Sequence, residues 1–311
     1  MQPSMSQSPS PDFAATWNRL AQKVADQHWP APALYVVATP IGNLGDLSLR
    51  ACQALTQCDV IAAEDTRASR TLLDAWGIST PLMAAHRHNE AGAAQAILQR
   101  LKQGERVGLV SDAGAPAVSD PGARIVRAVR EAGFPVVAIP GASAVITALM
   151  ASGATSDENP AFVFAGFTPA KSAARQKWLK QWTAVPAPVV MFESPHRLAA
   201  ALKDLLAVCG PERTLTVARE LTKRFEEVAT LRLGEAEQWL NEDAHRGQGE
   251  LVLIVHEQIV ARTGDGPDAA ALDLLDALLE VASVRDAARV AAKVTGLPRD
   301  VLYAAALERE R

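Results

Sequence analysis

Cysteine is scarce in this chain of 311 residues, and its three cysteines follow none of the spacings that disulfide frameworks or zinc sites use. Cys52, Cys58 and Cys209 are odd in number, and no two of them form a C-x-x-C pair. Isolated cysteines of this kind are typical of proteins that keep their thiols reduced. The sequence therefore predicts neither a disulfide-stapled scaffold nor a zinc site.

Long apolar runs are also missing. A membrane-spanning helix needs about 20 consecutive apolar residues, and no segment approaches that length. Residues 1–11 are rich in Ser, Pro and Gln and lack the basic and apolar regions of a signal peptide, so we interpret residues 1–32 as a disordered tail or loose helix. These patterns predict a soluble, cytoplasmic protein.

The chain has no excess of positive charge. It contains 31 Lys and Arg against 35 Asp and Glu, a formal net charge of −4. Any contact with nucleic acid therefore has to come from a local basic patch. Arg285, Arg289 and Lys293 predict one, because their spacing of four residues places them on one face of a helix. A solvated charged face would show the same pattern.

Three common ligand signatures are absent. No G-x-G-x-x-G follows an expected strand, and neither G-x-x-x-x-G-K-[ST] nor G-x-S-x-G occurs. The usual marks of dinucleotide sites, P-loops and nucleophile elbows are therefore missing. His86 and His88 would share one face of a strand, where a metal could bind, but two ligands make a weak site and we expect no metal.

What the sequence does contain is a regular alternation of short apolar runs and helical segments. Runs such as residues 33–38, 59–63, 107–110 and 135–139 are typical of buried parallel strands. The alternation predicts an α/β domain over residues 33–153. After a linker of small and acidic residues we expect a second, mixed α/β domain over residues 154–260. Residues 268–311 predict a small helical domain that resembles a helix-turn-helix pair.

The most informative segment is VGLVSDAGAPAVSDPG, at residues 107–122. A buried strand ends at Ser111 and Asp112, very small residues follow, and Asp120 with Pro121 predicts the start of a helix. This arrangement places ligands at the carboxyl edge of an open α/β sheet. Small residues also let backbone amides approach a ligand closely, although a tight loop with a capping Asp would look the same.

Unusual polar or Gly/Pro turns follow the other strands as well, and in order they resemble the motifs of the tetrapyrrole methylase superfamily. The motifs are ATPIGNLGD at 38–46, AEDTR at 63–67, SDAG at 111–114 with SDPG at 119–122, IPGASA at 139–144, FESPHRL at 192–198 and ARELTK at 218–223. Within the superfamily, the chain is similar to the 16S rRNA cytidine 2′-O-methyltransferases, and the resemblance covers residues 33–311.

The resemblance implies two α/β domains with S-adenosylmethionine in a cleft between them, plus a C-terminal helical domain. It also implies 2′-O-methylation of a cytidine ribose in the decoding centre of 16S rRNA, and a homodimer. Carried over by motif, the residues that would surround the cofactor are Pro40, Ile41, Asp112, Ala113, Gly114, Ala115, Ser143, Ala144, Phe192 and Ala218. The family usually has Thr and Leu where this chain has Ala115 and Ala117, so side-chain contacts there would be lost and backbone contacts kept.

Methyl transfer from a sulfonium is a one-step displacement, in which the protein mainly aligns the reacting atoms. A base that accepts the proton of the ribose hydroxyl would help further. The position of several charged residues at strand ends or in loops makes them candidates, with Glu64, Asp65 and Glu193 as bases and Arg67, Lys171 and Arg197 as phosphate ligands. Each also fits a structural role, as a helix cap for Asp65 and as ion pairs across the cleft for the others.

Two other functions remain open on the sequence. The first is a tetrapyrrole C-methyltransferase of the same fold, for which the terminal helices would have no use. The second is a non-catalytic RNA-binding protein on the same scaffold, against which the intact turns at residues 112–114 and 140–141 speak.

Overall fold

The structure, a computed structural model, describes residues 12–86, 89–157, 159–258, 267 and 269–309. The chain divides into two compact units, one ending at Glu257 and the other beginning at Gln258. Within the described part, no helix is both long and apolar enough to cross a membrane.

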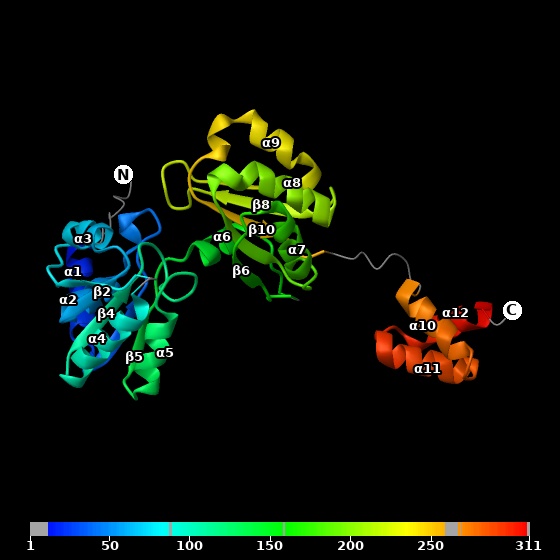
Figure 1. The fold of residues 1–311 in the computed structure, drawn as a ribbon, viewed down its shortest axis with the longest axis horizontal. Coiled ribbons are helices and arrows are strands. Elements are labelled where there is room, and N and C mark those ends of the chain that lie inside the picture. The colour runs from blue at the N-terminus through cyan, green and yellow to red at the C-terminus, as the bar shows by residue number, and fades with distance from the viewer. Residues whose placement is uncertain (1–11, 87–88, 158, 259–266, 268, 310–311) are drawn as a thin grey trace, which may run out of the picture. The chain divides into compact units, whose positions relative to one another are not determined.

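The first unit contains two five-stranded sheets (Figure 1). The first sheet is parallel throughout, in the order β3-β2-β4-β1-β5. Its strands are β1 (Ala33–Val37), β2 (Val60–Ala63), β3 (Leu82–Ala84), β4 (Arg106–Val110) and β5 (Val136–Ile139). The α/β fold predicted from their continuous apolar runs is confirmed.

Helices cover both faces of this sheet. On one face, α2 (Leu49–Gln57) and α3 (Thr66–Ala75) share a core with Tyr35. On the other face, α4 (Glu90–Lys102) and α5 (Ala123–Glu131) share a core with Leu34. The chain therefore leaves the adjacent strands β1 and β4 toward opposite faces, and this divergence opens a crevice at their carboxyl ends. A further helix, α1 (Phe13–Ala25), precedes the sheet.

The helix expected to start at Asp120 and Pro121 starts later, at Ala123. Its N-cap is Gly122, whose φ is 131° and which has no side chain to cap the helix. A carboxylate from α4 takes that role, because Oε1 of Glu90 accepts the N–H groups of Gly122 and Arg124 at 2.9 and 3.2 Å. The capping role predicted for Asp120 is therefore wrong.

The second sheet is mixed, in the order β6-β7-β10-β8-β9, with only the β6–β7 pair parallel. This agrees with the mixed α/β architecture predicted for this part of the chain. Its strands are β6 (Val163–Phe167), β7 (Val189–Glu193), β8 (Thr214–Arg219), β9 (Glu227–Arg232) and β10 (Leu251–Val255).

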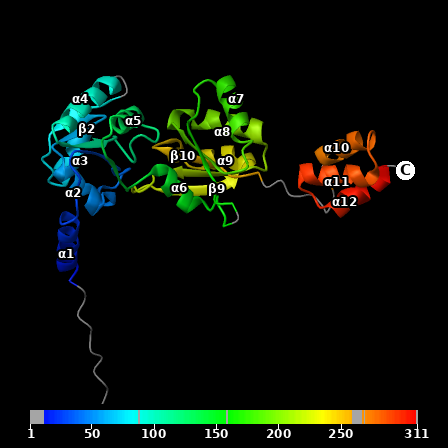
Figure 2. The ribbon, with the colours of Figure 1, turned by 90° about the horizontal axis from the view of Figure 1, so that it is seen from below.

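The two faces of the second sheet have different covers. One packs against α7 (Ser172–Trp182), α8 (Leu198–Cys209) and α9 (Ala236–Glu242). The other packs against α6 (Ala144–Ser152), which follows β5 of the first sheet along the chain. Figure 2 shows α6 and α8 on opposite sides of the strands. Short 3-10 helices complete this unit at η1 (Leu44–Asp46), η2 (Pro195–Arg197), η3 (Leu233–Glu235) and η4 (Ala244–Gly247).

The second unit is the expected small helical domain. Its helices are α10 (Ala269–Leu279), α11 (Val284–Thr295) and α12 (Arg299–Arg309). They enclose a core that includes Leu275, Ala288 and Leu302. The hydroxyl of Ser283 accepts the N–H of Asp286 to cap α11, and Gly296 ends that helix in the left-handed conformation.

Candidate active site

Two loops at the carboxyl edge of the first sheet are bonded to each other. The N–H of Thr39 donates to the carbonyl of Gly114 at 2.9 Å, and the N–H of Gly114 donates to the carbonyl of Thr39 at 3.0 Å. Gly114 has a φ of +76°, which glycine adopts without strain. Because these loops follow β1 and β4, they border the crevice described above.

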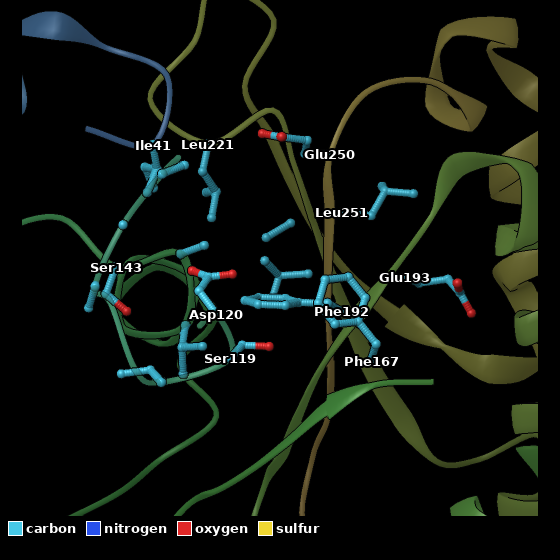
Figure 3. A pocket seen from close by; sticks show the side chains of 18 of the residues that line it. Ile41, Ser119, Asp120, Ser143, Phe167, Phe192, Glu193, Leu221, Glu250 and Leu251 are labelled. Carbon is cyan, nitrogen blue, oxygen red and sulfur yellow. The ribbon is translucent and has the colours of Figure 1, made fainter. Parts of the chain in front are cut away.

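A cavity of about 460 Å³ opens beside these loops (Figure 3). One part of its lining comes from the loops and α6 next to the first sheet, namely Ile41, Glu64, Asp112, Ala113, Gly114, Ala115, Val118, Ser119, Asp120, Ser143, Ala144 and Val145. The other part comes from the second sheet and its loops, namely Phe164, Phe167, Phe192, Glu193, Ser194, Pro195, Ala218, Leu221, Gly249, Glu250, Leu251 and Val252.

The charge of the lining has one sign. Its ionisable residues are Glu64, Asp112, Asp120, Glu193 and Glu250, and the described lining includes no Lys, Arg or His. Two of these carboxylates are paired with cations: Lys223 Nζ lies 2.8 Å from Glu250 and Arg197 Nη2 lies 2.7 Å from Glu193. Such a cavity favours a positively charged ligand over an anionic one.

Asp112 ties two loops of the site together. Its Oδ1 accepts the N–H of Asp65 at 2.9 Å, so the loop after β2 is held against the loop after β4. Glu64, the residue before this contact, lines the cavity directly after the end of β2. Glu64 is therefore the residue of this loop that borders the cavity.

Asp65 has a different role from its neighbour. Its carboxylate accepts the N–H groups of Arg67 and Ala68 at 2.8 and 3.4 Å and caps α3. These hydrogen bonds, led by that of Arg67, hold the pKa of Asp65 below its usual value. Asp65 is absent from the described lining, so its geometry fits the helix cap better than a general base.

Glu193 is enclosed by donors. Its side chain is fully buried and accepts hydrogen bonds from the Thr168 hydroxyl and, at 2.7 Å, from the Ser194 N–H, in addition to its pairing with Arg197. Figure 3 shows its carboxyl directed away from Asp120. The arrangement fits a carboxylate that holds the end of β7 in place, and the ion pair lies within the second half of the unit rather than across the cavity.

Most residues expected around the cofactor are brought together here. Of the ten, all but Pro40, which is buried, belong to the lining. Ala115 lines the cavity, whereas Ala117 does not and has a φ of 67°. The sequence analysis did not identify the lining residues Val118, Ser119, Asp120, Val145, Phe164, Phe167, Ser194, Pro195, Leu221, Gly249, Glu250, Leu251 and Val252.

The expected RNA-binding residues are spread over both units. Arg285, Arg289 and Lys293 are exposed on α11, where Arg289 pairs with Asp286 at 2.8 Å. In the first unit, the side chain of Arg67 is 92% exposed, Lys171 is exposed at the N-cap of α7, and Arg197 is held by Glu193.

The structure bears on the metal and cysteine predictions only within the part it describes. Among the described residues, no group of three or more His, Cys, Asp or Glu is arranged to hold a metal ion. His88, half of the pair considered above, lies outside the described residues. Cys52, Cys58 and Cys209 are free thiols, and burial raises the pKa of Cys58 to about 12, as expected for an inert cysteine.

Family models match most of the chain. The model of the Tetrapyrrole (Corrin/Porphyrin) Methylases matches residues 33–237, and the model of the RsmI C-terminal HTH domain matches residues 265–310. The chain is 43% identical to the ribosomal RNA small subunit methyltransferase I of Pseudomonas aeruginosa, over 90% of this chain and 98% of that protein. It is 45% identical to the protein of the same name from Vibrio cholerae, over 89% and 95%.

The fold is shared with more distant proteins. One is the uroporphyrin-III C-methyl transferase of Thermus thermophilus, complexed with S-adenyl homocysteine. The two structures superimpose with a TM-score of 0.50 at 18% sequence identity, over 72% of this chain and 96% of that one.

Proposed function

Because the chain belongs to the tetrapyrrole methylase family, we propose that it uses S-adenosylmethionine to methylate ribosomal RNA of the small subunit. The target in this proposal is the 2′-hydroxyl of a cytidine ribose in the decoding centre of 16S rRNA. Similarity to the ribosomal RNA methyltransferases over about nine-tenths of the chain supports RNA as the substrate, as does the match of the terminal helices. A tetrapyrrole methyltransferase would not need that terminal domain.

The observation that carries the cofactor assignment is the acid-lined cavity at the carboxyl edge of the first sheet. S-adenosylmethionine bears a sulfonium and an ammonium against a single carboxylate, so it is a net cation. The described lining contains five carboxylates, of which Glu193 and Glu250 are offset by Arg197 and Lys223, and no Lys, Arg or His, so its charge suits a cation. The backbone amides of the Asp112–Ala115 loop suit its polar end, and the apolar surface of Phe164, Phe192 and Ala218 suits an adenine ring.

The residues of the chain then have distinct tasks. When bound, S-adenosylmethionine would supply an electrophilic methyl group for the ribose oxygen, with S-adenosylhomocysteine as the leaving group. We assign Glu64 as the base that accepts the proton of that hydroxyl, because it lines the cavity and Asp112 holds the loop that carries it. Arg67, Lys171 and Arg197 remain proposed phosphate ligands.

Two measurements test the proposed function together. Calorimetry measures binding of S-adenosylmethionine, and tritiated cofactor is then supplied with assembled small ribosomal subunits that lack the modification. Label on a ribose hydroxyl of 16S rRNA is the expected result. Binding of the cofactor without label on RNA would reject the substrate, and the absence of binding would reject the proposal as a whole.

The charge of the cavity makes a quantitative prediction. The wild-type protein should bind S-adenosylmethionine more tightly than the neutral S-adenosylhomocysteine. Asp112→Asn should weaken binding of the cationic ligand about tenfold, or roughly 1.4 kcal/mol, and leave the neutral ligand within twofold. The asparagine can still accept the Asp65 N–H, so the loop contact is kept. Calorimetry with both ligands measures the ratio.

Asp59→Asn is the matched control. Asp59 also accepts one backbone N–H, that of Arg106 at 2.7 Å, but it is outside the described lining of the cavity. Asp59→Asn should leave the affinities for S-adenosylmethionine and S-adenosylhomocysteine unchanged. If Asp112→Asn weakens the binding of both ligands equally, the affinity depends on the conformation of the loop and not on the charge of Asp112.

Charge reversal on α11 tests the proposed RNA contact. The triple variant Arg285→Glu, Arg289→Glu and Lys293→Glu should weaken binding to RNA and lower the slope of log affinity against log salt by about 2 to 3, because each lost phosphate contact removes about 0.7 to 0.9. Binding assays over a range of salt concentrations measure the slope. Reversal of Lys102, Arg127 and Arg130, exposed cations of α4 and α5, is the control, and an unchanged slope in the α11 variant would reject that contact.

A further inference from the structure

Strand β6 contains a bulge that places two phenylalanines on the same face of the sheet. Phe164 is paired with Val190 and Gly166 with Met191, so the residue between them has no partner in β7. Side chains alternate along a regular strand, and residues 164 and 167 would otherwise lie on opposite faces. Gly166 has a φ of +81°, a conformation that favours glycine.

The result is a wall of three aromatic rings in the cavity. The ring of Phe192 lies 5.0 Å from that of Phe164 and 5.2 Å from that of Phe167, centroid to centroid, and both pairs meet edge to face. All three rings line the cavity, and Figure 3 shows Phe167 next to Phe192. Phe164 and Phe192 are partly buried against the apolar core around α6, whereas Phe167 is 59% exposed.

Phe167 is exposed, and the bulge directs it into the cavity. An apolar side chain in this position indicates a ligand with an apolar face. Bulges occur often beside binding sites, where they redirect a side chain. The two inner rings already provide the surface suited to the adenine of the cofactor. The outer ring is therefore available to a second flat group that enters from solvent.

The charge of the lining limits which part of an RNA can enter. The described lining contains carboxylates and no Lys, Arg or His, which disfavours phosphate groups, but the base and the ribose of a nucleotide are neutral. Enzymes that do chemistry on a base show that a protein can bind a nucleotide whose base has left the helical stack. Aromatic side chains bind such bases by stacking, whatever the base.

We propose that Phe167 stacks on the base of the nucleotide to be methylated and so holds its ribose over the cavity. This inference rests on the proposed RNA substrate. It assigns to Phe167 a binding role that is separate from the cofactor. It also gives a reason for the bulge and for the left-handed conformation of Gly166 near the end of β6.

The test compares variants of Phe167 with a matched control, with unmodified small ribosomal subunits as substrate. Phe167→Ala should raise KM for the subunit about tenfold or more, Phe167→Leu should do nearly the same, and Phe167→Trp should restore most of the loss, because only an aromatic ring stacks. Calorimetric affinity for S-adenosylmethionine should stay within twofold in all three. Phe162→Ala is the control, since Phe162 is 40% exposed just before β6 and is absent from the described lining.

The possible outcomes are distinct. If Phe167→Ala weakens cofactor binding as much as it raises KM, the ring belongs to the cofactor site and the inference is wrong. If Phe167→Leu behaves like the wild type, or if Phe167→Ala behaves like Phe162→Ala, stacking is likewise rejected. A wild-type protein that binds the cofactor but does not label RNA would instead overturn the proposed function, and this inference with it.

Discussion

Glu64→Gln is expected to lower kcat for RNA methylation by about 10²- to 10³-fold, the range typical of a lost general base. The glutamine keeps the size of the side chain and its hydrogen-bonding capacity but cannot accept the proton of the ribose hydroxyl. KM for S-adenosylmethionine should rise by no more than about tenfold, the effect expected for the loss of one lining carboxylate, because the loop at Asp112–Ala115 and the rings of Phe164 and Phe192 still hold the cofactor. Steady-state kinetics at saturating RNA separates the two parameters.

The neighbouring carboxylate supplies the control. Asp65→Asn removes a charge one residue away, but asparagine is also a good N-cap, so α3 should keep its cap and kcat should stay within about twofold. Glu193→Gln tests the third candidate base, whose carboxyl is occupied by Thr168, Ser194 and Arg197. A larger loss of kcat in Asp65→Asn than in Glu64→Gln would contradict the assignment.

Asp204→Ala is expected to lower the free energy of unfolding by about 3 to 5 kcal/mol, the usual result of breaking a buried ion pair. Arg175 of α7 and Asp204 of α8 are both buried. Nε and Nη2 of Arg175 lie 2.7 and 2.5 Å from Oδ2 of Asp204, and Ser172 and Gln176 donate to Oδ1 at 2.8 and 2.7 Å. The alanine variant leaves a buried guanidinium without its counter-ion. Urea unfolding followed by circular dichroism measures the loss.

An exposed pair is the matched control for this prediction. Arg70 and Asp74 lie one turn apart on α3 with a separation of 3.4 Å, and the side chain of Asp74 is 64% exposed. Asp74→Ala should cost less than about 1 kcal/mol. A cost in Asp204→Ala as small as that of the exposed pair would show that the buried network contributes little.

The same network determines how the free energy of unfolding depends on pH. Burial alone would raise the pKa of Asp204, but hydrogen bonds from Gln176, Ser172 and Arg175 outweigh it, so the pKa is lowered. A carboxyl with a lower pKa in the folded protein stabilises it above the pKa of the unfolded chain, about 3.9, and loses this effect as pH falls through the folded value. The difference in free energy of unfolding between the wild type and Asp204→Ala should therefore be largest at pH 7 and become smaller below about pH 4. A gap that widens in acid would contradict this account.

The first sheet was predictable because a strand covered by helices on both faces has a continuous apolar sequence, as at Leu34–Val37. The start of α5 was not predictable in the same way. Asp120 and Pro121 satisfy the local rules for a helix start, but Glu90 supplies the cap from a helix far earlier in the chain. Local sequence patterns contain no information about such a tertiary contact.

The residues of the site were also predictable only in part. The loop of small residues at 112–115 was identifiable because its composition serves a single purpose, close approach of backbone to a ligand. Glu64 and Asp65 are neighbouring carboxylates of equal chemistry, and only the backbone path decides which one caps α3. Glu250 enters the lining just before β10, where its carbonyl accepts the N–H of Glu220 beyond β8, and Phe167 enters it through a bulge. Both depend on pairing between strands that are distant in sequence.

Helix α6 has a consequence for how this protein can be divided. It follows β5 directly, yet Val145 and Leu149 pack against Val190 and Ile254 of the other sheet. If the chain were cut just after α6, one fragment would contain an apolar helix without its packing partner. The other fragment would contain an uncovered apolar sheet face, which favours aggregation. An exchange of domains between relatives should therefore transfer both sheets as one piece, which also keeps the two sides of the cavity lining together.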